Sequence, residues 1–343
     1  MERTSKIIPL NIVFTYPVHW DSFQILRDYI QNFYDSVPVD QWAKRFQYEF
    51  SDGTLTMRVE DSSFSYEWLL HIGASTKTNS EEKHAGYFGE GFKIASLCAL
   101  RDKHWEIKMS SGNWSINVIC TDQTIDGQNV KMLAYNLTES ETSIPKSELI
   151  LQGVSIADFN IFKTALRSFY HPENELLGEK IWENCDGAVY TRSKKQYDNE
   201  LPYNYSYGRK GIVFCGYQIR GSNPFDLVVC LHDFEQNDRE RDSLLDMEVV
   251  TVFKRMSALL PAQASFKIVE KMRRVWISNS TDRFDFESWT SVLRRLLYNI
   301  LFSSEYCKKF KDKYPNLLYL YPTLSKIQMN WRQEARCWYK KSS

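Results

Sequence analysis

Apolar residues recur with helical spacing between residues 20 and 38 of the chain. At about 100° per residue they form one stripe about 80° wide, which predicts a helix with a single buried face. The stripe consists of Phe23, Leu26, Ile30, Phe33 and Val37. Asp21 or Ser22 can cap this helix at its start, and Pro38 ends it.

The opposite face of this helix is polar. Asp28, Asn32 and Asp35 follow i, i+4, i+7 spacing and lie about 180° from the apolar stripe. One face can therefore pack on a sheet while the other presents two carboxylates and a carboxamide. Spacing alone makes a plain solvent-facing stripe the simpler interpretation of these three residues.

Alternating apolar and polar residues predict strands before and after a second helix. Residues 46–61 alternate on both sides of a Ser-Asp-Gly turn, which predicts a hairpin that ends in Glu60 and Asp61. Residues 66–71 predict a short helix. Further strands are predicted at 104–110, 113–121, 130–137 and 153–159, with turns at Ser-Gly-Asn and Asp-Gly between the first three. These strands favour an antiparallel meander.

The periodicity breaks near residues 171–187 and then resumes in a different form. Strand-like runs follow at "AVYTR", "GIVFCGYQI" and "FDLVVCL", and the pattern from residue 244 onward is mostly helical, most clearly in "SWTSVLRRLLYNILF". We therefore expect an α/β (α+β) protein in three parts, with boundaries at 1–170, 188–260 and 261–343.

The composition is typical of a folded, reduced protein. With 343 residues, 43% of them hydrophobic, the chain can bury a large core in two or three domains. The seven cysteines are widely spaced and form no CxxC pair, which argues against structural zinc. No signal peptide and no run of 18 apolar residues is present, so we expect a cytoplasmic protein without a membrane segment.

Charge is distributed unevenly along a chain whose formal net charge is zero. Residues 261–343 hold 16 basic and 7 acidic residues, a net charge of +9, and the rest of the chain is acidic. This end can contact DNA or an acidic partner, but basic solvent-facing sides of a helical bundle give the same asymmetry.

Three of the chain's 14 glycines, Gly86, Gly89 and Gly91, stand directly ahead of a run that predicts a helix. Glycine lets backbone N–H groups approach an anion closely, and a helix start adds unsatisfied donors, so the segment can bind phosphate. Taken alone, the glycines are equally compatible with a tight turn. Lys93 follows them and can add positive charge, although a surface lysine is the default interpretation.

Four motifs in this order resemble those of the GHKL superfamily of ATPases, which includes DNA gyrase, the ninety-kilodalton heat-shock chaperones, histidine kinases, MutL and the MORC proteins. They are "LRDYIQNFYDS", "VEDSSFS", "GASTK" and "AGYFGEGFKIA". The resemblance covers residues 20–160 and, more loosely, 188–245. It implies a Bergerat-type sandwich in residues 1–170, where the first helix and a glycine-rich lid enclose ATP and Mg²⁺ above a sheet.

The resemblance assigns roles to the polar face of the first helix. Asn32 matches the magnesium-ligating asparagine of the family, since an amide oxygen can coordinate a hard cation that bridges phosphates. Asp28 stands where many members carry the glutamate that activates the attacking water, and aspartate is one methylene shorter. Asp35 occupies a polar position that helps to line the pocket in relatives.

Asp61 matches the aspartate that accepts a hydrogen bond from the adenine amine. The family's D-x-G-x-G motif becomes Asp61-Ser62-Ser63-Phe64-Ser65, so both glycines are replaced by serine. Gly153-Val154 stands where relatives often have a Gly-Thr that contacts the nucleotide. The phosphate and lid residues implied by the resemblance are Gly73, Ser75, Thr76, Lys77, Gly86, Gly89, Gly91 and Lys93.

Residues 188–260 resemble the transducer domain of the gyrase, MutL and heat-shock branch, in which a basic residue senses the γ-phosphate. Arg239 or Arg241 is the candidate, and the pattern does not choose between them. The resemblance implies a slowly hydrolysing ATPase that acts as a switch or clamp. It also implies that ATP promotes a homodimer or the capture of a protein partner, and it suits a microbial ATPase such as those of phage-defence systems. The alternative is a degenerate nucleotide-binding scaffold without turnover.

Overall fold

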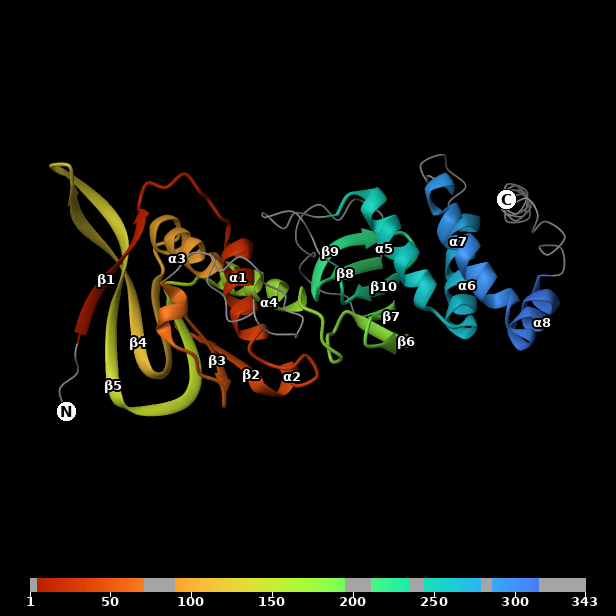
Figure 1. The fold of residues 1–343 in the computed structure, drawn as a ribbon, viewed down its shortest axis with the longest axis horizontal. Helices are drawn as coiled ribbons and strands as arrows, with labels where there is room; N and C mark the ends of the chain where they lie inside the picture. The colour runs from red at the N-terminus through yellow and green to blue at the C-terminus, as the bar shows by residue number, and fades with distance from the viewer. Residues whose placement is uncertain (1–4, 71–89, 195–210, 235–243, 279–285, 315–343) are drawn as a thin grey trace. The chain divides into compact units, whose positions relative to one another are not determined.

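A computed structural model describes residues 5–70, 90–194, 211–234, 244–278 and 286–314 of the chain (Figure 1). The described residues form two compact units, one up to Asn174 and the other from Glu175 onward. Each unit combines one β-sheet with helices, which confirms the α+β class. None of the helices among the described residues is long and apolar enough to cross a membrane.

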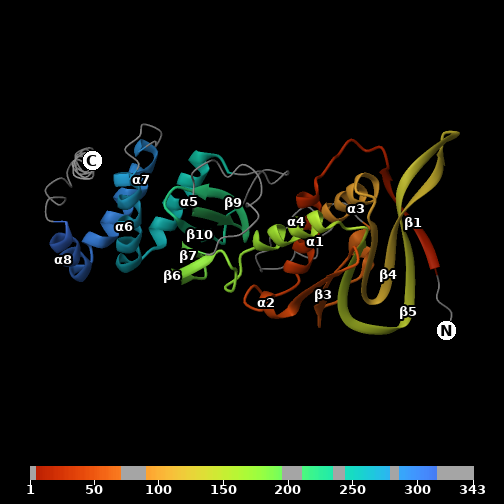
Figure 2. The same ribbon diagram turned by 180° about the vertical axis from the view of Figure 1, so that it is seen from behind.

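The first unit is an antiparallel sheet covered on one face by helices. Its elements are β1 (Ser5–Val13), α1 (Ser22–Tyr34), α2 (Trp42–Arg45), β2 (Phe46–Ser51), β3 (Thr54–Glu60), the 3-10 helix η1 (Tyr66–Leu69), α3 (Gly91–Asp102), β4 (Glu106–Ile125), β5 (Gln128–Gln152) and α4 (Ile156–Arg167). The strand order is β1-β5-β3-β2, and β4 pairs with β5. Helix α1 packs against both α3 and α4, and the three lie on the same side of the sheet (Figures 1 and 2).

Helix α1 forms as its sequence predicts. Asp21 accepts a hydrogen bond from the backbone N–H of Gln24, whose side chain accepts one in return, so both ends of a capping box are present. All five apolar residues of the predicted stripe are buried. The hairpin of β2 and β3 is also confirmed, with Ser51 paired to Thr54 across the turn.

The meander differs from its prediction. The Ser-Gly-Asn segment is a bulge inside the long strand β4, where Gly112 has a φ of 60° and the register with β5 shifts. The turn at Asp126-Gly127 is confirmed, with positive φ at both residues. The strand predicted at 153–159 is wrong, because Ser155 caps α4. The sheet instead ends with the C-terminal part of β5, up to Gln152, which pairs with β3 on one side and β4 on the other.

The second unit contains a mixed sheet and four helices among its described residues. Its elements are β6 (Leu177–Asn184), β7 (Gly187–Arg192), β8 (Gly211–Cys215), β9 (Gln218–Asn223), β10 (Leu227–Leu231), α5 (Asp246–Leu259), α6 (Ala262–Ser278), α7 (Phe286–Leu301) and α8 (Ser304–Lys313). The strand order is β6-β7-β10-β8-β9, and only the β10–β8 pair is parallel. The run "GIVFCGYQI" is a hairpin that turns at Gly216 and Tyr217, both at positive φ.

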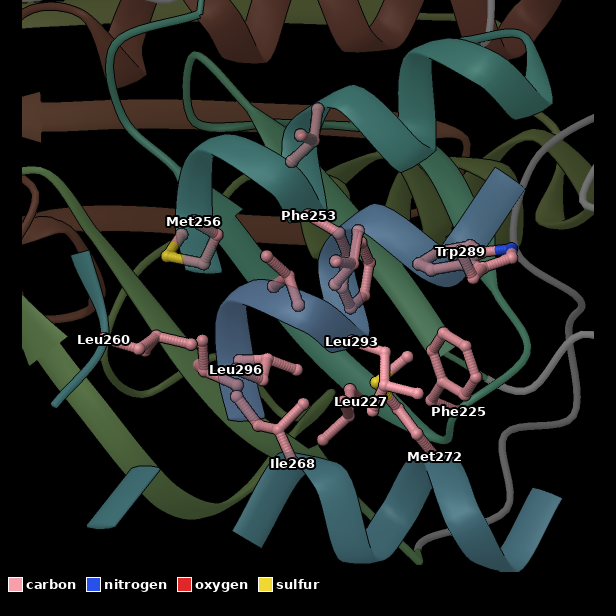
Figure 3. Packing of buried hydrophobic residues seen from close by; sticks show 14 of the residues in the cluster. Phe225, Leu227, Phe253, Met256, Leu260, Ile268, Met272, Trp289, Leu293 and Leu296 are labelled. Atoms are coloured by element: carbon pink, nitrogen blue, oxygen red, sulfur yellow. The ribbon is translucent and has the colours of Figure 1, made fainter. Parts of the chain in front are cut away.

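One hydrophobic core joins this sheet to the helices that follow it (Figure 3). Trp289 of α7 meets Phe225 and Phe253 edge to face, with ring centroids 4.6 and 5.0 Å apart. The amide of Asn299 donates to the carbonyl oxygens of Ser257 and Leu260, at 2.8 and 3.0 Å, which ties α7 to the end of α5. Residues on both sides of position 260 therefore share one core.

Candidate functional site

Helices α1 and α3 lie antiparallel in the first unit. The backbone N–H of Trp20 donates to the Sγ of Cys98 at 3.4 Å, which sets the start of α1 beside the end of α3. The hydroxyls of Tyr29 and Ser96 are hydrogen-bonded at 3.1 Å, which joins the middle of α1 to the middle of α3. The start of α3 also approaches the middle of α1, because Gly91 contacts Asp28.

Asp28 contacts Gly91, the first residue of α3. A Cβ added to Gly91 would lie 1.9 Å from Oδ2 and 2.6 Å from Oδ1 of Asp28, so the carboxylate occupies the space that any other residue would need. Asp28 is only 5% exposed. The predicted solvent-facing position of Asp28 is therefore wrong, because the first turn of α3 covers it. A carboxylate at this position is favoured by the positive end of the helix dipole.

Asn32 lies one turn after Asp28 and is exposed. Its amide nitrogen donates to the backbone carbonyl of Asp28 at 2.9 Å, which leaves the amide oxygen as an outward acceptor. Asp35 is half-buried and forms the C-terminal cap of α1, with its N–H bonded to the carbonyl of Gln31. The three polar residues of α1 thus differ in exposure, and Asn32 presents the accessible oxygen.

Lys93 is buried in the first turn of α3, where a surface position was the default expectation. Lys93 is 2% exposed, and its Nζ makes no hydrogen bond to any residue that the structure describes. Burial lowers the pKa of the Lys93 ammonium to about 8, although the negative charge of Glu90 acts in the opposite direction. A buried ammonium without a hydrogen-bond partner is costly, and an anion bound near the start of α3 would offset that cost.

The C-terminal half of α1 lies over the end of β3 that leads to Asp61. The ring of Phe33 is 5.8 Å from that of Phe46, and Phe46 pairs with Val59 in the hairpin. Asp61 is exposed and has a φ of 55°, in the left-handed region that aspartate tolerates better than most residues. Its backbone carbonyl accepts a hydrogen bond of 3.1 Å from Arg45.

Two buried serines that the motif analysis missed hold the segment after Asp61. The hydroxyls of Ser111 and Ser147 are 2.9 Å apart, on paired positions of β4 and β5. Ser147 donates to the carbonyl of Ser62, and Ser111 accepts from the N–H of Phe64, each at 2.9 Å. Both serines occupy inward positions of strands whose other inward residues are apolar. A polar residue at such a position in the sequence pattern is the signal that could have identified them.

Gly153-Val154 does not join these residues. Gln152 pairs with Thr54 at one end of β3, whereas Asp61 follows the other end of that strand. The expectation that the pair lies with the motif residues is wrong for this reason. Gly153 has a φ of 84° and closes the sheet beside the β2–β3 turn, where the N–H of Val154 donates to Gly53.

Several predicted site residues lie outside the described part of the chain. These are Gly73, Ser75, Thr76, Lys77, Gly86, Gly89, Arg239 and Arg241. Among the described residues, no group of three histidine, cysteine or acidic side chains is arranged to hold a metal ion. No protein-family model matches this chain, and a search of curated proteins finds no significant match.

Proposed function

We propose that the first unit binds ATP with Mg²⁺ and hydrolyses it slowly, as a divergent GHKL-type ATPase with a Bergerat-like sandwich. The contact between Asp28 and Gly91 carries the proposal. It sets a carboxylate at the start of a helix that follows a glycine-rich segment, and Asn32 lies one turn after Asp28 on the same helix α1. Helix starts of this kind bind phosphate through open backbone N–H groups. Glu90, the N-cap of α3, makes no side-chain cap that would block them.

The burial of Lys93 supports an anionic ligand at this helix start. An ammonium that is 2% exposed and has no hydrogen-bond partner among the described residues loses its hydration, and the negative charge of Glu90 compensates only part of that loss. Negative phosphate charge near the first turn of α3 favours its protonated form. A structural lysine would instead be expected to pair with a carboxylate or to extend its head into water.

The residues of α1 fit a magnesium ion that is bound mainly by phosphate and water. Such ions take only one or two protein ligands, and an exposed amide oxygen on a rigid helix is suitable as one of them. Asn32 would hold the ion, which supplies charge neutralisation to the phosphates when bound. The lack of a three-ligand cluster in the described residues is compatible with this mode of binding.

Asp28 is the residue that we propose to accept a proton from the attacking water. It lies at the start of α3, where the phosphates would bind, and a carboxylate is a suitable group for general-base catalysis. Because it is 5% exposed and touches Gly91, its carboxylate is held in one position. Asp61, at the neighbouring end of β3, would accept a hydrogen bond from the adenine amine and so select adenine over guanine.

A scaffold that binds nucleotide without turnover is the second candidate. The observation that favours it is the segment Ser62–Phe64, which the hydroxyls of Ser111 and Ser147 hold against the sheet. This segment replaces the glycines of the family motif, and its bonds restrict movement next to Asp61. A site rebuilt in this way can keep its shape while it loses activity.

Phosphate release from ATP separates the two candidates. We expect slow magnesium-dependent release by the wild type, a loss of at least about tenfold in Asp28→Asn with ATP affinity retained, and loss of magnesium-dependent affinity in Asn32→Ala. Asp40→Asn is the matched control, because Asp40 is exposed and outside the site. Binding without release would favour the scaffold, and no binding of ATP would refute both candidates.

We propose that the second unit acts as the transducer and that ATP binding promotes dimerisation or capture of a partner. The elution volume with and without a non-hydrolysable ATP analogue tests this, since an unchanged volume contradicts the dimerising clamp. DNA binding through the basic C-terminal part is a weaker proposal. Two of the four lysines of α8, Lys309 and Lys313, already pair with Glu305 and Glu270.

A further inference from the structure

A separate cavity opens beside η1 in the first unit. It has a volume of about 500 Å³ and is lined by three aromatic residues, Phe64, Tyr66 and Trp114, and by the carboxylates of Glu67 and Glu139. No residue of α1 or α3 lines it, whereas Ser63, Phe64 and Ser65, which follow Asp61 in the chain, do, so it lies beside the proposed adenine position and away from the start of α3.

The aromatic wall of this cavity is held rigidly. The Nε1 of Trp114 donates to the carbonyl of Phe64 at 2.6 Å. The rings of Phe64 and Tyr66 meet the Trp114 ring edge to face, with centroids 5.2 and 6.2 Å away. Trp114 follows the bulge at Gly112 and pairs with Glu139, which sets the carboxylate beside the indole. The bulge therefore aims Trp114 and Glu139 into the same cavity.

The cavity carries negative charge that no basic side chain of the described residues pairs with. Glu67 and Glu139 are exposed, and neither forms an ion pair with a described residue. The remaining lining consists of serine, glycine and asparagine, so no basic side chain is among the lining residues. Partial burial raises the pKa of the Tyr66 hydroxyl, and the charges of Glu139 and Glu67 raise it further. Both carboxylates thus act on the hydroxyl of Tyr66.

Two exposed apolar side chains neighbour lining residues of the cavity, one through strand pairing and one in sequence. Ile144, which pairs with Gly112, is 64% exposed, and Trp68, two residues after Tyr66, is 42% exposed. Large apolar residues around a pocket with aromatic and charged walls are typical of surfaces that bind proteins.

We propose that this cavity binds an arginine side chain of a protein partner. A guanidinium group is planar, stacks on aromatic rings and donates several hydrogen bonds to carboxylates, so it matches both kinds of wall. Ile144 and Trp68 are the exposed apolar residues that would contact the residues flanking the arginine. The negative lining excludes phosphates and acidic peptides.

Titration with a short peptide tests the proposal. The probe is acetyl-Gly-Arg-Gly-amide, and its binding to the full chain is measured by saturation-transfer NMR of the peptide signals. The control is the same peptide with citrulline in place of arginine, which keeps the shape of the side chain but removes its charge. We expect binding of the arginine peptide, weaker by about fivefold in Glu139→Gln and further in the Glu67→Gln/Glu139→Gln double variant. Glu141→Gln removes an equal charge from the same strand outside the cavity and should bind as the wild type does.

Three results would overturn the proposal. They are equal binding of the citrulline peptide, unchanged affinity in the double variant, and displacement of the arginine peptide by ATP with magnesium, which would mean that the nucleotide enters this cavity. The affinity of each variant for ATP is measured separately, so failure of this proposal is distinguishable from failure of the ATPase proposal. Because both glutamates are exposed, the variants should fold normally, which thermal unfolding checks.

Discussion

Replacing Gly91 with alanine tests the contact on which the candidate site depends. The new Cβ would lie 1.9 Å from Oδ2 and 2.5 Å from Cγ of Asp28, whereas real Cβ contacts below 3.0 Å are essentially never observed. The carboxylate must therefore move by roughly 1 Å, and a displacement of this size can lower a reaction rate about 100-fold. Gly91→Ala should reduce ATP turnover accordingly.

The cost in stability follows from the same geometry. Forcing extra volume into a packed site costs about 1 to 3 kcal/mol, and the better helix propensity of alanine offsets up to about 1 kcal/mol of this. Gly91→Ala alone should therefore destabilise the first unit by about 1 to 2 kcal/mol. In the Asp28→Ala background the overlap disappears, and the same substitution should be neutral or stabilising. The coupling energy between the two positions is then about 1 to 3 kcal/mol.

Hydrogen exchange of peptides from α1 and α3 measures this double-mutant cycle locally. A local measurement is needed because a chain with two compact units need not unfold in a single two-state transition. If the effects of the two substitutions add within about 0.5 kcal/mol, Asp28 and Gly91 do not interact as described. Unchanged turnover in a folded Gly91→Ala protein would likewise contradict the role of the Asp28 carboxylate.

Further predictions concern buried polar groups. The pKa of Lys93 is about 8 in the folded protein and 10.5 ordinarily, so the unfolded chain binds more protons than the folded chain between pH 8 and pH 10.5. The free energy of unfolding should therefore rise with pH in this interval, by up to about 3 kcal/mol. Lys93→Met should remove this rise, as urea titrations at pH 7.5 and 10 would show. Ser111→Ala leaves the N–H of Phe64 without its acceptor and should cost about 1 to 3 kcal/mol, seen as faster exchange in residues 62–65. Asn223→Ala breaks hydrogen bonds to the carbonyls of Ile212 and Leu227 inside the second unit, and it should lower the free energy of unfolding by at least about 3 kcal/mol, as thermal unfolding would show. A loss below about 1 kcal/mol would contradict the described network.

Features that depend on neighbouring residues were predictable from the sequence. The start and the buried stripe of α1 follow from a capping residue and helical periodicity, and the structure agrees, but the helix ends at Tyr34, before the Pro38 that was expected to end it. The β2–β3 hairpin follows from alternation around Ser-Asp-Gly. The sequence also predicted a helix after the three glycines. The helix α3 begins at the last of them, Gly91. Each of these signals acts over a few residues, so a linear pattern contains it.

Other features depend on elements that are far apart in the chain. Ser-Gly-Asn was interpreted as a turn, yet it is a bulge, because β5 is long enough to pair with β4 on both sides of it. The end of β5 was missed and a strand was placed at 153–159 instead, since only the pairing with β3 shows where the sheet stops. Local turn chemistry alone does not distinguish a bulge from a turn.

The sequence by itself determined that α1, the hairpin and α3 form and where α1 begins, and it placed Asp28 and Asn32 one helical turn apart. Only the tertiary structure decided that Asp28 is buried against Gly91, that Lys93 loses its water, and that Ser111 and Ser147 hold the segment after Asp61. The physical reason is that the exposure of a side chain and its hydrogen-bond partners depend on the segments that pack against it. At these positions the neighbouring segments are more than 30 residues away in the sequence.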